Sequence, residues 1–343
     1  MREKFSRRDF FRATAGLAAL APPLAGLGTP VVVDWPAYAK ATAGKRVAGP
    51  IFLATWEHGK PTCEKAAEVL LAGGSLLEAV EKGVNTAELD PLVLSVGYGA
   101  LPNADGELEL DAAIMDGPTH TAAAVAGLKM IATPISVARR VLEKTTHTLL
   151  AGEGALRFAI AEGFNPAQLL TPEALKRWHE WRANPHRRQY WRTSARQRST
   201  TKDTEPPGSR LGENPSGHLE AGSEDTHSMP VGEAAADTIT LVACDTCGNL
   251  AAGGSTSGLA WKLPGRVGDV SLIGCGIYVD NDVGAAGATG NGDEMIKFCT
   301  SLSIVERMRA GMSPQEACED VLRWMLRKNP ANRDTQACVY ALS

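Results

Sequence analysis

The chain has 343 residues, of which 44% are hydrophobic, and its formal net charge is −4. This length accommodates one large or two ordinary domains with a sizeable core. The slightly acidic balance gives no electrostatic reason to expect a nucleic-acid partner. After the N-terminal region, no run of about 20 apolar residues indicates a transmembrane helix.

Seven cysteines are present, an odd number in a long chain, and this does not indicate a disulfide scaffold. Cys244 and Cys247 have CxxC spacing, but no second pair and no histidine pair accompany them as zinc would require. We expect them to flank a hairpin turn at residues 245–249. Neither a metal nor a cofactor is expected.

Residues 1–44 are predicted to form an export signal and leader. Ser-Arg-Arg-Asp-Phe-Phe at 6–11 resembles a twin-arginine motif, and a weakly apolar stretch follows at 13–27. Ala-Tyr-Ala at 37–39 is a candidate cleavage site. We therefore expect a periplasmic or secreted protein with no other membrane association; the alternative is a basic, disordered N-terminus.

Residues 45–183 are predicted to form the N-terminal part of a single domain. Ser75 and Glu78 form a capping box, and Thr171 precedes Pro172 as the N-cap of a later helix. The pattern predicts strands at 51–56 and through 108–114, and helices at 63–71, 75–87, 119–130, 136–143, 153–161 and 172–182.

Residues 184–237 change in character: they are rich in Arg, Pro, Gly and Ser and contain few apolar side chains. Such a segment cannot bury enough surface to order itself, so we expect a flexible linker on the surface. Its basic first half is balanced by acidic residues from Asp203 onward, which favours a solvated linker over a nucleic-acid patch.

Residues 238–343 return to an ordered pattern. They predict a hairpin at 238–244 and 250–254, one or two strands within 270–279, helices at 291–308 and 314–328, and a last strand at 336–342. Because strands and helices are grouped rather than strictly alternating, the order favours an α+β protein with stacked layers.

Thr238 opens a strand directly after the linker, behind Asp237. A threonine hydroxyl needs a base, and an N-terminal threonine has its own α-amino group, with a pKa of about 7.7–8.0. That arrangement requires the Asp237–Thr238 bond to be broken. The expected route is attack of the Thr238 hydroxyl on the preceding carbonyl, promoted by Asp237, followed by hydrolysis of the ester.

Four motifs follow one another at fixed points: Asp-Thr-Ile at 237–239, Ser-Thr-Ser-Gly at 255–258, Gly-Arg-Val-Gly-Asp at 265–269 and Ala-Thr-Gly-Asn-Gly-Asp at 288–293. Together they resemble the signature of the glycosylasparaginase and plant-type asparaginase family. The resemblance covers roughly residues 50–182 and 237–343. It implies an N-terminal nucleophile hydrolase with a four-layer αββα sandwich.

The glycosylasparaginase branch fits best, because Thr55-Trp56 ends the first strand and no His-Gly-Gly-Ala-Gly run is present. The resemblance implies cleavage of the amide between N-acetylglucosamine and asparagine, with Thr238 as the nucleophile. The resemblance implies that Thr256 hydrogen-bonds the nucleophile; the alternative is that Thr256 only stabilises a turn.

The resemblance also implies a substrate-binding set. Arg266 would hold the α-carboxylate of the substrate and Asp269 its α-ammonium; the alternative is an ion pair between the two. Thr289 and the Gly290 N–H would form the oxyanion hole, or a helix N-cap turn. Trp56 would form a wall of the site, or be a core tryptophan.

Three departures from the family pattern are present. Ala236 stands where relatives commonly have His, Val270-Ser271 stands where Ser-Pro is usual, and relatives continue with further strands after the one expected at 336–342. The part at 238–343 is therefore expected to be shorter than in relatives, and self-cleavage to be slower. Cys318 and Cys338 are predicted to approach within disulfide range.

Two other functions stay open at this point. The same chemistry would serve a β-aspartyl peptidase or an L-asparaginase. The departure at Ala236 and the short C-terminal part would also fit an unprocessed homologue that only binds asparagine derivatives. Relatives form dimers of the cleaved α/β heterodimer, so a similar assembly is expected.

Overall fold

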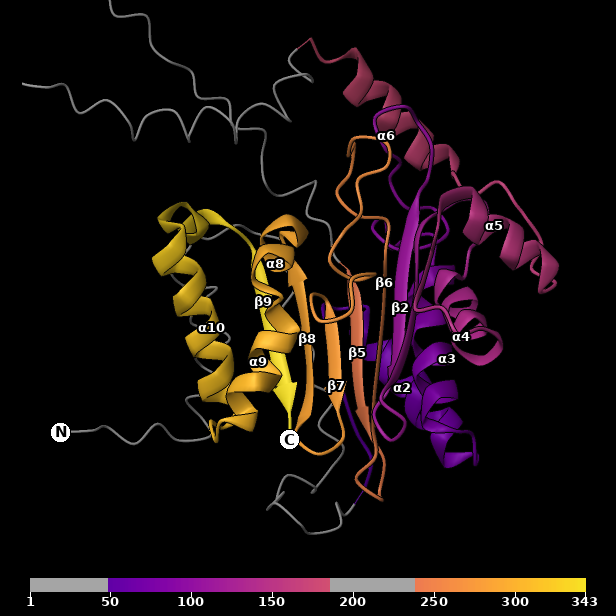
Figure 1. Ribbon diagram of the computed structural model, residues 1–343. Helices are drawn as coiled ribbons and strands as arrows, with labels where there is room; N and C mark the ends of the chain where they lie inside the picture. The colour runs from indigo at the N-terminus through magenta and orange to yellow at the C-terminus, as the bar shows by residue number, and fades with distance from the viewer. Residues whose placement is uncertain (1–48, 186–237) are drawn as a thin grey trace, which may run out of the picture.

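The computed structural model describes residues 49–185 and 238–343 (Figure 1). The predicted leader, most of the linker, Ala236 and Asp237 lie outside these residues, so the predictions on them stay predictions. Among the described residues, no helix is long and apolar enough to cross a membrane.

The described chain is a mixed α/β protein, as the sequence predicts, with two sheets. Its strands are β1 Ile51–Ala54, β2 Leu110–Asp116, β3 Thr121–Leu128, β4 Leu149–Ala151, β5 Ile239–Cys244, β6 Leu250–Thr256, β7 Ile277–Asp280, β8 Gly284–Gly290 and β9 Ala337–Leu342. Its helices are α2 Gly59–Leu71, α3 Leu76–Leu89, α4 Pro134–Lys144, α5 Gly152–Ala161, α6 Pro172–Ala183, α8 Gly292–Phe298, α9 Thr300–Arg309 and α10 Pro314–Lys328, with a 3-10 turn at Pro330–Asp334.

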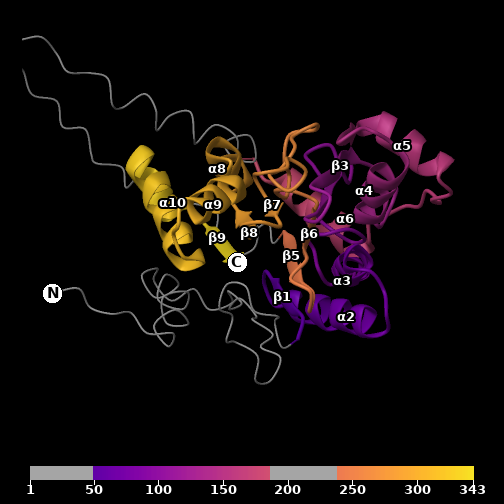
Figure 2. The same ribbon diagram turned by 60° about the horizontal axis from the view of Figure 1, so that its bottom comes forward.

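The larger sheet has the order β1-β5-β6-β2-β3-β4, and the smaller one the order β7-β8-β9. Adjacent strands are antiparallel except for β3 and β4. Helices α2, α3 and α4 pack on one face of the larger sheet, and α9 and α10 pack on the smaller sheet. Figure 1 shows the two sheets between these two groups of helices, and Figure 2 shows the same arrangement from a second direction.

Strand β5 shows how the alternation of side chains builds two cores. Leu241 belongs to the core beneath α2–α4, whereas Val242 belongs to a core that includes Ile277 and Ala285 of the smaller sheet. Successive residues of a strand point to opposite faces, so β5 is buried on both sides. The Tyr340 hydroxyl donates a 3.0 Å hydrogen bond to Thr240 Oγ1 and joins the sheets across this inner core.

Several local predictions are confirmed. Ser313 and Glu316 form a complete capping box at the start of α10, and Thr171 accepts a hydrogen bond from the Ala174 N–H at the start of α6. The hairpin turn predicted at 245–249 is confirmed, although Cys247 lies within it instead of flanking it; Asp245 holds the turn by accepting from the Cys247 and Asn249 N–H groups.

Two predicted elements are wrong. Residues 119–130 contain the strand β3 instead of a helix: alanines fit there because the middle of β3 is buried between two neighbouring strands. The predicted helix at 291–308 is broken into α8 and α9 at Cys299, whose φ of 43° is left-handed. The one or two strands predicted within 270–279 are confirmed as one, β7, which begins at Ile277 after turns at 270–276.

Cys318 and Cys338 are free thiols in the structure. Burial raises the pKa of Cys318 to about 12 and that of Cys338 to about 11, and the Cys338 thiol adds to the shift at Cys318. The two are therefore neighbours, and their approach to disulfide range stays a prediction.

Candidate active site

Thr238 lies immediately before β5, and its hydroxyl donates a 3.0 Å hydrogen bond to Thr256 Oγ1 at the end of β6. The register that pairs Ile239 with Ser255 brings these two threonines opposite each other. Both are buried. Thr256 Oγ1 also accepts a 2.9 Å hydrogen bond from the Gly258 N–H, which fixes its orientation. The contact predicted between Thr238 and Thr256 is confirmed.

Thr55, at the end of β1, fixes the backbone around the candidate nucleophile. Its hydroxyl donates a 2.8 Å bond to the Thr238 carbonyl and accepts a 3.0 Å bond from the Thr240 N–H. These two bonds lie on either side of Ile239 and hold the start of β5 against β1. No local pattern predicts this role of Thr55, because its partners are more than 180 positions away.

Trp56 follows Thr55 and adopts a left-handed backbone conformation with a φ of 61°. Such a conformation is strained for a bulky side chain and is most common at functional positions. The indole ring is partly buried, and its Nε1–H is a buried donor without a partner in the described part of the chain. Both observations favour the predicted place of Trp56 at the wall of the site over a purely structural role.

The loop from Gly265 to Asp269 brings Arg266 next to the two threonines. A Cβ added at Gly268 would lie 3.3 Å from Arg266 Nη1 and 3.8 Å from Thr256 Cγ2, so Gly268 is a neighbour of both the guanidinium and Thr256. Arg266 Nη2 forms an ion pair of 3.2 Å with Asp293. Its Nε is buried and has no partner among the described residues.

Asp269 lies beside Arg266 at the start of α8: a Cβ added at Gly292 would be 2.6 Å from Asp269 Oδ1 and 3.0 Å from Arg266 Nη2. Within the described chain Arg266 pairs with Asp293 instead of Asp269, so the alternative of a mutual ion pair is wrong. Asp269 Oδ2 is buried and has no partner in residues 49–185 and 238–343. Burial raises the pKa of Asp269 to about 7, while its own backbone N–H and the Arg266 charge act in the opposite direction.

Thr289 and Gly290 end β8, next to this pair. The Gly276 N–H donates to the Asp269 carbonyl, and the Gly276 carbonyl accepts from the Ala288 N–H. Gly276 therefore bridges the segment that contains Asp269 and the strand that contains Ala288. The Thr289 hydroxyl is fully buried and has no partner among the described side chains. It does not cap α8, because Asn291 accepts from the Glu294 N–H there.

Gly290 has a φ of 118°, which L side chains rarely adopt, and a Cβ at this position would lie 2.3 Å from the Gln336 carbonyl oxygen. Only glycine fits here. The polar groups around Thr238 thus include four buried atoms without partners among the described residues, on Trp56, Arg266, Asp269 and Thr289. Buried polar groups are otherwise almost always hydrogen-bonded, so four of them around one cluster point to a place for a polar ligand.

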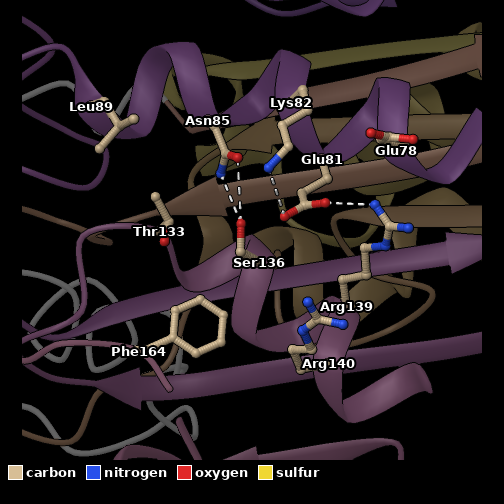
Figure 3. Close-up of a pocket in the computed structure, with 10 residues that line it drawn as sticks. All are labelled: Glu78, Glu81, Lys82, Asn85, Leu89, Thr133, Ser136, Arg139, Arg140 and Phe164. Carbon is tan, nitrogen blue, oxygen red and sulfur yellow. Dashed lines mark hydrogen bonds and ion pairs between the residues drawn. The ribbon is translucent and has the colours of Figure 1, made fainter. Parts of the chain in front are cut away.

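A surface pocket of about 600 Å³ lies away from this cluster, between α3 and α4 (Figure 3). Its lining includes Glu81, Asn85 and Arg139 and none of the predicted site residues. Because α3 and α4 cover the outer face of the larger sheet, this pocket is separated from the nucleophile by that sheet.

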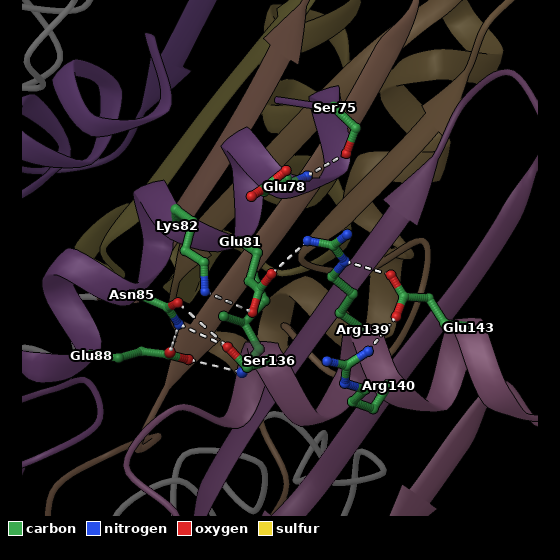
Figure 4. Close-up of polar contacts among 11 residues, drawn as sticks. Ser75, Glu78, Glu81, Lys82, Asn85, Glu88, Ser136, Arg139, Arg140 and Glu143 are labelled. Atoms are coloured by element: carbon green, nitrogen blue, oxygen red, sulfur yellow. Dashed lines mark hydrogen bonds and ion pairs between the residues drawn. The ribbon is translucent and has the colours of Figure 1, made fainter. Parts of the chain in front are cut away.

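Glu88 is the buried end of the polar network next to this pocket (Figure 4). Its carboxylate accepts 2.8 Å and 2.9 Å hydrogen bonds from Asn85 Nδ2 and the Ile135 N–H. Burial raises the pKa of Glu88 to about 7 in spite of these bonds. No cluster of three or more His, Cys, Asp or Glu side chains arranged for a metal ion occurs in the described ranges.

Comparison with known proteins agrees with this geometry. The family described as "Asparaginase" matches residues 57–333. An N(4)-(beta-N-acetylglucosaminyl)-L-asparaginase of Elizabethkingia miricola is 37% identical over 342 residues, covering 98% of this chain and 86% of the relative. The protein of the same name from Rattus norvegicus is 41% identical over 273 residues, covering 80% of this chain and 76% of the relative. The chain therefore belongs to the asparaginase family of amidohydrolases.

Proposed function

We propose that this amidohydrolase cleaves the amide between N-acetylglucosamine and asparagine, with Thr238 as an N-terminal nucleophile. The observation that supports this most is the Thr238–Thr256 hydrogen bond beside a cluster of buried polar atoms without described partners. The names of the relatives from Elizabethkingia miricola and Rattus norvegicus support the choice of substrate.

Activation begins with self-cleavage. The Thr238 oxygen attacks the Asp237 carbonyl carbon, the peptide C–N bond breaks and an ester forms. Water then hydrolyses the ester, which leaves a carboxylate on Asp237 and a free α-amino group on Thr238. The Thr55 hydroxyl, which holds the Thr238 carbonyl, keeps the nucleophile in place before and after this step.

Hydrolysis of the substrate repeats the attack on a different carbonyl. The Thr238 hydroxyl gives its proton to its own α-amino group and adds to the side-chain amide carbon of asparagine. The Thr289 hydroxyl and the Gly290 N–H stabilise the oxyanion. The amino sugar leaves with a proton and later loses ammonia, and water hydrolyses the aspartyl ester to aspartate.

Arg266 and Asp269 bind the amino-acid end of the substrate. The guanidinium pairs with the α-carboxylate, and the Asp269 carboxylate accepts from the α-ammonium. Substrates therefore need both groups free. Trp56 forms a wall of the site, with its indole N–H turned to the ligand.

The arrangement of two facing sheets between two groups of helices supports assignment to the αββα sandwich of N-terminal nucleophile hydrolases. We further propose export through the twin-arginine motif at 6–11 and assembly as a dimer of cleaved heterodimers. Both proposals follow from the sequence pattern and the family alone.

The test compares hydrolysis of N-acetylglucosaminyl-asparagine with that of a β-aspartyl dipeptide, for the wild type and for Thr238→Ala. The proposal predicts faster cleavage of the glycosylated substrate, and no cleavage of either by the variant. A preference for the dipeptide would make the protein a β-aspartyl peptidase. Hydrolysis by Thr238→Ala would contradict the mechanism.

A further inference from the structure

Asp111, on β2, is a completely buried carboxylate whose two oxygens accept from two different backbone groups. Oδ1 accepts a 2.8 Å hydrogen bond from the Gly127 N–H, and Oδ2 accepts a 2.9 Å bond from the Gly268 N–H. Gly127, which has a left-handed φ of 58°, lies in β3 opposite an irregularity of the β2 register. One side chain thus joins the larger sheet to the loop that carries Arg266 and Asp269.

The register places this link beside the nucleophile. Asp111 is the cross-strand partner of Thr256, which accepts the hydrogen bond from Thr238. Gly268, which Asp111 holds, directly precedes Asp269. A single carboxylate, that of Asp111, therefore connects the strand beside the nucleophile to the loop whose side chains bind the amino-acid end of the substrate.

Glu109, which directly precedes β2 and lies two residues before Asp111, holds the other end of this loop. Its Oε2 accepts a 3.1 Å hydrogen bond from the Gly265 N–H, and its backbone carbonyl accepts a 3.1 Å bond from Lys262 Nζ. Both carboxylates thus bind backbone amides on either side of Arg266. The difference between them is that the Glu109 side chain serves one amide, whereas Asp111 serves two in different segments.

We propose that Asp111 is a positioning residue that sets the place of Arg266 and Asp269 relative to Thr238 and thereby the selectivity for substrates with a free α-carboxylate. This inference rests on the proposed function of the same site. Asp111 touches no reacting atom and acts through the Gly268 N–H. Glu109 also engages both its oxygens, but with the single Gly265 N–H, whereas Asp111 accepts from amides of two different segments.

Replacing each carboxylate by the corresponding amide distinguishes the role of Asp111 from that of Glu109. In Asp111→Asn one oxygen becomes an NH2 group, which would face a backbone N–H, so one of the two amides loses its acceptor. In Glu109→Gln the remaining carbonyl oxygen still serves the Gly265 N–H. The two changes each remove one buried negative charge two residues apart and next to the same loop, so Glu109→Gln is a matched control.

The experiment measures kcat and KM for N-acetylglucosaminyl-asparagine and for its analogue without the α-carboxylate. For Asp111→Asn we expect KM for the full substrate to rise about 10- to 100-fold, with a smaller change in kcat. The preference for the full substrate over the analogue should fall by a similar factor. Glu109→Gln should change KM less than about threefold. The preference is a ratio within one preparation, so partial unfolding does not alter it.

Gly268→Ala is the second variant, for the case that Asp111→Asn does not fold. Its Cβ would lie 3.6 Å from Asp111 Oδ2, an ordinary contact, but 3.3 Å from Arg266 Nη1, so it presses on the guanidinium that the Asp111–Gly268 bond positions. It should also raise KM and reduce the preference. An unchanged preference in a folded Asp111→Asn, or in Gly268→Ala if the first variant is insoluble, overturns the inference. A wild type that does not hydrolyse the full substrate refutes the proposed function instead.

Discussion

Replacement of Asp269 by Asn tests how the buried carboxylate binds the α-ammonium. Burial raises the pKa of Asp269 from 3.8 to about 7, which corresponds to roughly 4 kcal/mol for ionising it in the empty site. A substrate ammonium offsets this cost, so binding selects the ionised form. Removing one partner of such a buried pair costs about 3–5 kcal/mol, and we expect kcat/KM to fall about 10²- to 10⁴-fold in Asp269→Asn.

The pH profile gives a second, independent readout. In the wild type two groups must lose a proton before reaction: Asp269, with a pKa of about 7, and the Thr238 α-amino group, ordinarily about 7.7–8.0. The profile of kcat/KM reports both, so its logarithm should rise with a slope approaching two at low pH. In Asp269→Asn only the amine titrates, and the slope should be one.

The matched control is Asp293→Asn. Asp293 pairs with Arg266 at 3.2 Å, but its side chain is 53% exposed, so its contribution is small. We expect kcat/KM to change less than about fivefold and the slope of two to remain. An Asp269→Asn enzyme that keeps this slope, or stays within fivefold of the wild type, would refute the assigned role of Asp269.

Two further predictions concern the nucleophile and the stability of the fold. Thr256→Val leaves the buried Thr238 hydroxyl without its acceptor, so kcat should fall about 10- to 100-fold with little change in KM; a kcat within threefold of the wild type would show that this contact is dispensable. Glu88 has a folded pKa of about 7, above the ordinary 4.5, so its contribution to the free energy of unfolding falls as pH rises from about 4.5 to 7, by about 3 kcal/mol in all. When urea unfolding is measured between pH 5 and 8, the free energy of unfolding of Glu88→Gln should fall less than that of the wild type. An equal fall would contradict the raised pKa assigned to Glu88.

The sequence predicts some local features of the fold well because their signals are short in range. Ser313 and Glu316 lie three residues apart, so the capping box and its helix can be recognised locally. The hairpin that pairs Thr238 with Thr256 is similarly local, since its strands are joined by a short turn around Asp245.

The errors have physical causes that depend on distant contacts. Residues 121–128 carry many alanines, which favour a helix in isolation, but the structure places them between β2 and β4, where small side chains fit. The helix breaks at Cys299, which adopts a left-handed backbone conformation although cysteine is not a typical helix-breaking residue.

Sequence alone also does not predict which side chains bind the loop at 265–269. Asp111 lies 157 positions from the Gly268 amide that it holds, so no local pattern connects them. Asp293 was part of a recognised motif, but its ion pair with Arg266 depends on how α8 packs against that loop.

The most direct test of the central claim is the intact mass of the purified protein under denaturing conditions, for the wild type and for Thr238→Ala. The account predicts a wild-type fragment that begins at Thr238, and an uncleaved chain for the variant. A wild-type protein that hydrolyses the glycosylated substrate while no fragment begins at Thr238 would contradict the account.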